Sequence, residues 1–418
     1  MRRVAVLVLM GSCLAQGANL TLEQFRRMAQ TEREKMARRY TQRDRDDFWR
    51  VEGFKYQVRA QGSSEQALEI ALLMDEFYDS FARTFKGGFS IATQPRLYVF
   101  ADRDAYLEFM KVRDVDGAEP TGGMYLTSDR LLVTFAKATD EHLKQTLFHE
   151  ATHQLLHTYT VKRSLPPWYN EGMATNFQLW EPSRSLRENV RMAIIESHYR
   201  SQVAAEAREG KLPDLQALAA MDGDDWLENF DGANYAAAWS FVNFLLSSED
   251  GQRRLDRVLR ALKKGTPVEK VMPPAVVRKL ERQWHEDIRT RLMLYDEFIA
   301  PALHAASEGQ VDEAIAHLEV GIAGHPSLPD GRFYRARLLL EKDRFAEALA
   351  DLEAVAEQDA DFPDLHLLLG RAALAAGDPA KARSHLQTHL RSHRDDQQAK
   401  ELLREANRTL RTATRPAG

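Results

Sequence analysis

Two histidines stand four residues apart in LFHEATHQLLHTY, which runs from Leu147 to Tyr159. On a helix, residues i and i+4 lie on one face, so His149 and His153 can direct ring nitrogens to one point at the bond length that zinc requires. Glu150 is turned by about 100° from His149 and would reach a metal-bound water instead. The alternative is a charged helix that contains the motif by accident, with odds on the order of a few per cent in a chain this long.

A catalytic zinc site also needs a third protein ligand and a coordination position open to water. The stretch PPWYNEGMATNF supplies Glu171, eighteen residues after His153, where a new helix is expected after Pro166 and Pro167. A carboxylate that opens a buried helix without a basic neighbour is costly unless it is paired or bound to a metal. Glu171 is therefore the predicted third ligand.

Together, HEATH and WYNEGMA resemble the gluzincin metallopeptidases, the superfamily of thermolysin and aminopeptidase N, and most of all its peptidase-MA-like bacterial branch. The resemblance covers roughly residues 54–291. It implies that His149, His153 and Glu171 bind Zn²⁺. It also implies that Glu150 acts as general base on the zinc-bound water and later delivers a proton to the leaving amine.

The same resemblance implies a downstream tyrosine that hydrogen-bonds the oxyanion of the tetrahedral intermediate. In NYAAAWSFVNFLL, Tyr235 stands at about the family's distance from Glu171. Tyr169 is the rival candidate for this role. A purely structural role for Tyr235, in the core beside Trp239, stays open as the alternative.

The chain departs from the family pattern at several positions. GGMYL, Gly122 to Leu126, lacks the acidic residue of the aminopeptidase motif, which favours endopeptidase or limited processing activity. Thr175 occupies the position where thermolysin-like enzymes have an aspartate that orients the first histidine, so the partner of that histidine is undefined. His142 and His157 do not fit metzincin spacing and are interpreted as solvent-exposed or as partners of the ligands.

The elements that must position these residues follow from apolar periodicity. We expect strands at 54–60 and 96–100, a long helix at 64–85 and a short helix at 102–111. A hairpin or pair of edge strands is expected at 122–135, followed by nearly continuous helix after Thr139. This order predicts an α+β fold with a small mixed sheet, active-site helices and a helical subdomain.

The C-terminal third carries an internal period of 34 residues. Small residues, leucines and turn residues recur in one register: Ala302, Ala336 and Gly370; Ala314, Ala348 and Ala382; Leu318, Leu352 and Leu386; Gly309, Asp343 and Gly377. Small side chains let the two helices of each repeat pack closely. These repeats resemble tetratricopeptide (TPR) repeats, so an all-α solenoid that binds a protein partner is expected.

The first residues, MRRVAVLVLMGSCLAQGA, predict an export signal, with Arg2 and Arg3 before a short apolar run. We therefore expect a periplasmic or secreted protein without a transmembrane segment in its mature chain. Cys13, the only cysteine, also stands where lipoprotein signals are acylated, so a lipid anchor is a second hypothesis. The predicted order is a signal at 1–17, a helical segment at 18–50, a metallopeptidase domain at 51–294, about three repeats at 295–395, and a capping helix and tail at 396–418.

Two functional hypotheses remain. The first is an exported zinc metallopeptidase that cleaves peptides or proteins and binds a partner through its repeats. The second is a non-catalytic TPR scaffold whose metal site is vestigial or structural. The formal charge of −5, with 28% charged residues finely interspersed, argues against nucleic acid as a partner.

Overall fold

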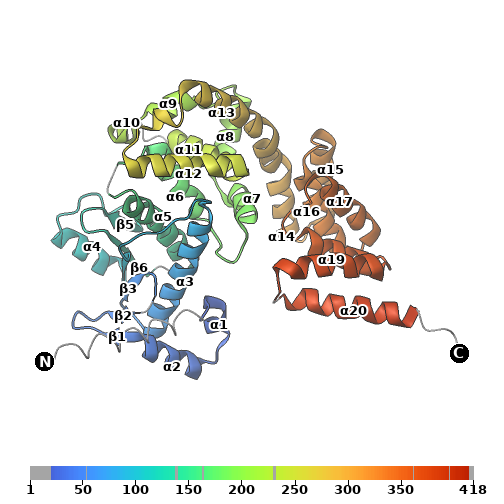
Figure 1. Cartoon of the computed structure of the whole chain (residues 1–418), viewed down its shortest axis with the longest axis horizontal. Helices are drawn as coiled ribbons and strands as arrows, with labels where there is room; N and C mark the ends of the chain where they lie inside the picture. The colour runs from blue at the N-terminus through green and yellow to red at the C-terminus, as the bar shows by residue number, and fades with distance from the viewer. Residues whose placement is uncertain are drawn as a thin grey trace. The chain divides into compact units, whose positions relative to one another are not determined.

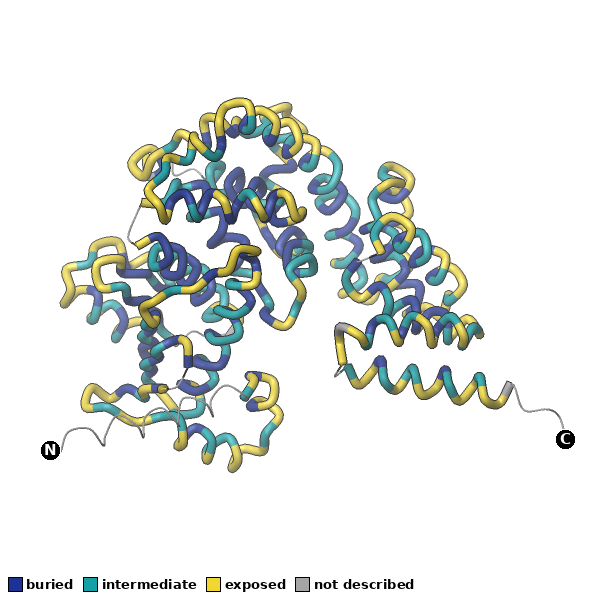
Figure 2. Tube along the Cα trace, in the orientation of Figure 1, coloured by how far each residue is buried: buried dark blue, intermediate teal, exposed yellow. Residues whose placement is uncertain are grey.

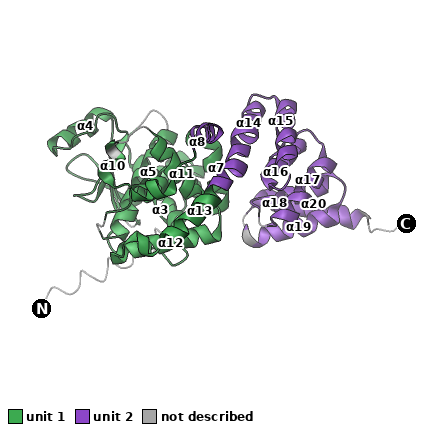
Figure 3. Ribbon diagram, turned by 90° about the horizontal axis from the view of Figure 1, so that it is seen from above, with its two compact units in different colours: residues 1–199, 212–284 green, residues 200–211, 285–418 purple. Residues whose placement is uncertain are grey.

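The computed structural model describes residues 20–413, apart from residues 53, 137–139, 162–163, 229–231, 361 and 395 (Figure 1). The predicted signal at 1–17 and the lipidation hypothesis at Cys13 lie outside the described residues. The chain divides into two compact units, shown in Figure 3. The first contains the residues up to Tyr199 together with Leu212–Trp284, and the second contains Arg200–Lys211 and the chain from His285 onward. The predicted domain boundary at 294/295 stays a prediction.

A six-stranded mixed sheet lies in the first unit, in the order β1-β2-β3-β4-β6-β5. Its strands are β1 (Thr41–Arg43), β2 (Trp49–Val51), β3 (Gln57–Ala60), β4 (Arg96–Phe100), β5 (Gly123–Leu126) and β6 (Leu131–Phe135). Strands β3, β4 and β6 run parallel, and β5 pairs antiparallel with β6. The predicted hairpin at 122–135 is therefore present, and its first strand forms an edge of the sheet.

The N-terminal segment is helical only in its first part, in α1 (Leu22–Arg27) and α2 (Gln30–Tyr40). The expectation of a helical segment through residue 50 was wrong, because β1 and β2 form a hairpin there that pairs with β3. Asp44 closes the turn by accepting hydrogen bonds from the backbone N–H groups of Asp46 and Phe48. Asp47 takes a positive φ of 68°, which aspartate tolerates better than most residues.

Two long helices pack on the sheet, α3 (Ser64–Arg83) and α5 (Asp140–Tyr159), while α4 (Arg103–Val112) follows β4. Phe77 of α3 stacks on Phe148 of α5 with ring centroids 4.2 Å apart. The fully buried Gln154 of α5 donates to the carbonyl oxygens of Arg96 and Arg130. These contacts fix both the position and the rotation of α5 against the strands.

The remainder of the first unit is helical: α6 (Pro167–Phe177), α7 (Leu186–Glu196), α9 (Leu215–Ala220), α10 (Gly223–Glu228), α11 (Ala233–Leu246), α12 (Glu249–Lys264) and α13 (Pro274–Asp287), the last of which ends three residues into the second unit. Helix α11 is buried along most of its length (Figure 2) and packs against α6. Asn176 of α6 donates to the carbonyl of Trp239 and accepts from Asn243. Because buried polar groups need partners, these bonds fix the register of α6 on α11.

The second unit joins helix α8 (Tyr199–Arg208), apart from its first residue, to the C-terminal helices. Asp296, in the π-helical turn η4 (Tyr295–Ile299), accepts hydrogen bonds from Arg200 Nε at 3.1 Å, Ser201 Oγ at 2.9 Å and Arg208 Nη2 at 2.8 Å. These partners outweigh burial and lower the pKa of the Asp296 carboxyl. Helix α8 is thus held to the start of the C-terminal helices although it precedes α9 in the chain.

Three helical hairpins and a final helix follow: α14 (Ala300–Ser307) with α15 (Val311–Gly324), α16 (Pro329–Glu341) with α17 (Phe345–Gln358), α18 (Leu365–Ala375) with α19 (Pro379–Ser392), and α20 (Gln397–Ala413). The repeated alanines and leucines at the 34-residue spacing are fully buried. Gly309, Asp343 and Gly377 take positive φ values of 80°, 56° and 84° in the turns between paired helices. Among the described residues, no helix combines the length and apolar character that crossing a bilayer requires.

Candidate metal centre

Three predicted ligands converge between α5 and α6. Nε2 of His149 lies 3.2 Å from Nε2 of His153, and Oε2 of Glu171 lies 3.9 Å and 3.7 Å from these two nitrogens. Among the described residues, these are the three side chains that gather with metal-binding geometry. A circle through three atoms at these separations has a radius of about 2.1 Å, the length of a zinc bond to imidazole or carboxylate. The donor set and its spacing therefore fit zinc.

The burial of α5 and the start of α6 explain how the two helices place these three side chains. Leu147, Phe148, Ala151 and Leu155 bury one side of α5, which leaves the two histidines on another, partly exposed side. Pro167 stands in the first turn of α6, where its missing N–H costs no helical hydrogen bond. Asn170 Nδ2 donates to Oε1 of Glu171 at 3.3 Å. The other carboxylate oxygen of Glu171, Oε2, is the one near the histidines.

Glu150 is placed beside the ligands but outside their cluster. Its Oε2 accepts a hydrogen bond from the backbone N–H of Tyr125, 2.8 Å away, on the edge strand β5. Strand and helix approach closely here, since a Cβ on Gly123 would lie 2.8 Å from Cγ2 of Thr146. The carboxylate is thus held between the ligand helix and the sheet edge.

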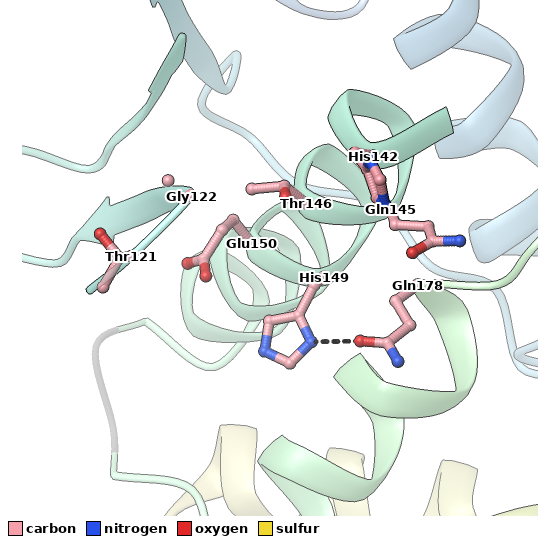
Figure 4. Close-up of a pocket in the computed structure, with 9 residues that line it drawn as sticks. Thr121, Gly122, His142, Gln145, Thr146, His149, Glu150 and Gln178 are labelled. Atoms are coloured by element: carbon pink, nitrogen blue, oxygen red, sulfur yellow. Dashed lines mark hydrogen bonds between the residues drawn. The ribbon is translucent and has the colours of Figure 1, made fainter. Parts of the chain in front are cut away.

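Gln178 is a site residue that the sequence analysis missed. It caps the C-terminal end of α6, and its Oε1 lies 3.2 Å from Nδ1 of His149 (Figure 4). An acceptor at Nδ1 places the ring hydrogen there and leaves the Nε2 lone pair for a metal. Thr175 is directed elsewhere: its hydroxyl donates to the carbonyl oxygens of Glu171 and Gly172, one turn back on its own helix. Gln178 follows Glu171 by seven residues, which is two helical turns and places both on the same face of the helix. This spacing is the feature of the sequence from which Gln178 could have been predicted.

Replacing Gln178 by leucine should weaken zinc binding by about tenfold or more, because His149 would lose the acceptor that fixes its tautomer. Gln178→Glu restores an acceptor and should retain affinity. Competition for zinc against a chelating dye measures both variants. Gln145→Leu is the matched control, since Gln145 lines the same cavity and bonds to Glu141 instead. Unchanged affinity in Gln178→Leu would remove Gln178 from the site.

Burial and charge set the protonation of the two histidines. Burial, together with the neighbouring His153, lowers the pKa of His149 to about 3, against the opposing effect of Gln178. Burial also disfavours charge on His153, but Glu171 and Glu150 outweigh it and raise the pKa of His153. His149 is therefore neutral at physiological pH, as a metal ligand must be.

Three tyrosines occupy different positions relative to this centre. Burial and the negative charges of Glu171 and Glu150 raise the pKa of Tyr235 to about 12, so its hydroxyl remains a proton donor. Burial and Glu171 also raise the pKa of Tyr199, a second tyrosine near the site that the sequence analysis missed. Tyr169, by contrast, is fully buried and donates to the carbonyl of Leu255 at 3.1 Å. The hydroxyl of Tyr169 therefore bonds to α12 and not to the metal centre.

A cavity of about 490 Å³ opens beside His149 and Glu150. Its other lining residues, several of them labelled in Figure 4, are Thr121, Gly122, Gly123, His142, Gln145, Thr146 and Gln178. His142 belongs to this wall. His157 lies one turn beyond His153, and its Nδ1 is 2.8 Å from the hydroxyl of Tyr125. The cavity is a polar space adjoining the centre, of a size that small ligands and side chains occupy.

Two parts of the chain match known family models. Residues 144–269 match a family described as a protein of unknown function (DUF1570), and this segment contains the three clustered ligands with Glu150 and Tyr235. Residues 339–406 match the tetratricopeptide repeat. A search of curated proteins finds no match to the chain. The TPR prediction is thus confirmed for 339–406, and protein partners are what such solenoids bind through their extended concave surfaces.

Proposed function

We propose that this chain is an exported zinc metallopeptidase that hydrolyses peptide bonds in protein substrates. The convergence of His149, His153 and Glu171, with Glu150 held beside them, carries the proposal. Three protein ligands are the number that catalytic zinc sites use. The resemblance of the two motifs to gluzincins supports the same assignment, and the apolar N-terminal run supports export.

Zinc bound at this centre would acidify a water molecule and polarise the scissile carbonyl. Glu150 would accept the proton of the attacking water and deliver it to the leaving nitrogen, because its carboxylate lies next to the ligands without being one. Strand β5 would bind the substrate backbone, since an edge strand can add an extended peptide as a further strand, and the N–H of Tyr125 already marks where this edge meets Glu150. The repeats would hold the substrate protein or a partner.

Tyr235→Phe should reduce kcat by about 10²-fold while zinc content and stability remain unchanged, because only one donor to the developing oxyanion is lost. The measurement is the peptidase rate under saturating substrate, beside metal analysis. Tyr199→Phe is the matched comparison, since both tyrosines lie near Glu171. A large loss in Tyr199→Phe alone would transfer the role to Tyr199.

The scaffold hypothesis is the second candidate, because the TPR match supports protein binding by itself. A digest of a broad peptide library distinguishes the peptidase hypothesis from the scaffold hypothesis. The zinc-reconstituted chain should cleave library peptides, and a chelator should stop cleavage until zinc is returned. A zinc-loaded chain that cleaves no peptide and no protein would refute the peptidase and leave the scaffold.

A further inference from the structure

The last repeat, in the second unit, contains a group of histidines that are not part of the metal centre. His366 lies on α18, His385 and His389 lie four residues apart on α19, and His393 follows directly after the end of α19. His389 has a partner in Asp396, with Nε2 2.8 Å from the carboxylate, and the ring of His393 stacks on it. His366 and His385 face each other instead, and no part of the proposed peptidase involves them.

The two facing rings bring like atoms together. Nδ1 of His366 lies 3.0 Å from Nδ1 of His385, and the rings are stacked with centroids 5.2 Å apart. Two lone pairs at this distance repel unless a proton or a cation lies between them. The separation is close to the roughly 3.3 Å between two nitrogen ligands on a tetrahedral zinc ion.

A carboxylate lies near this pair on the preceding helix. Glu353 of α17 contacts Nζ of Lys381 at 2.5 Å, and Lys381 is one turn before His385 on α19. The carboxylate also acts electrostatically on His385. Both members of the Glu353–Lys381 pair are partly exposed, so separating them costs little. A divalent cation at the imidazoles would repel Lys381 and attract Glu353.

We propose that His366 and His385 bind a second divalent transition-metal ion, with Glu353 released from Lys381 to serve as third ligand. The three side chains come from three successive helices, α17, α18 and α19. The ion would therefore link the second repeat to the third and stabilise the solenoid. Imidazole with carboxylate suits zinc, copper or nickel. This site is independent of peptidase activity and stands if the proposed function fails.

Calorimetric titration of the metal-stripped full chain with zinc tests the site. We expect two ions in the wild type and one in His153→Ala, where the first centre is broken. Adding His366→Gln to His153→Ala should weaken the remaining ion by about tenfold or more. His317→Gln is the control, because His317 is a histidine of α15 with 42% side-chain exposure outside the group. At zinc tenfold above its Kd, His153→Ala should also melt a few degrees higher than without zinc.

Glu353→Gln is a second test in case the histidine variants fail to fold. The side chain of Glu353 is 45% exposed, so replacing it should not disturb the fold. In the His153→Ala background Glu353→Gln should weaken zinc by about tenfold while circular dichroism stays unchanged. A His153→Ala chain that binds no zinc would overturn the proposal. The proposal would also be overturned if neither His366→Gln nor Glu353→Gln weakened zinc binding. His366 and His385 would then be a hydrogen-bonded pair without a metal.

Discussion

A chain with His153 replaced by alanine is expected to lose one zinc ion and, with it, all peptide hydrolysis. The remaining His149 and Glu171 would form a two-ligand site, with the negative charge of Glu171 poorly compensated in a partly buried position. Metal analysis after gel filtration and the peptidase rate on a library-derived substrate measure the two losses. The fold should survive, because His153 lies on the partly exposed side of α5.

His157→Ala is the matched control for zinc content, since it removes a histidine one turn along the same helix that pairs with Tyr125. It should leave the zinc content of the first centre intact. Hydrolysis at the wild-type rate in His153→Ala would contradict the metallopeptidase proposal at its base.

Glu150→Gln should leave zinc bound and lower the peptidase rate by about 10²-fold or more, because an amide cannot accept the proton of the attacking water. The amide oxygen can still accept the hydrogen bond from the N–H of Tyr125, so the sheet edge should keep its place. Rate and zinc content are measured on the same preparation. Glu141→Gln, an exposed position on the same helix, is the control. Full activity in Glu150→Gln would end the peptidase assignment, whereas lost zinc would make Glu150 structural.

Sequence periodicity predicted those parts of the molecule that depend on one helix or one repeat. The spacing of His149 and His153 is enough to bring their Nε2 atoms together, since a single helix fixes their relation. The 34-residue register likewise places small residues at the helix contacts, where Ala314, Ala348 and Ala382 are buried. Glu171 could be predicted as a third candidate ligand because WYNEGMA places it at the start of a new helix.

Relations between elements were harder to predict. Gln178 reaches His149 only because α5 and α6 cross at one particular angle, and nothing in the periodicity of either helix gives that angle. Thr175, at the position of the family's aspartate, bonds to its own helix, and the partner of His149 lies three residues further along, at Gln178. The β1–β2 hairpin was hidden for a similar reason: its strands are three residues long, and their pairing depends on the turn at Asp44.

The attachment of α8 to η4 has a consequence for shortened chains. Arg200 and Arg208 are encoded between segments of the first unit, yet their partner Asp296 lies at the head of the repeats. A chain cut before Asp296 would leave both arginines without this carboxylate. No single cut can separate the two units intact, because α8 of the second unit precedes residues 212–284 of the first.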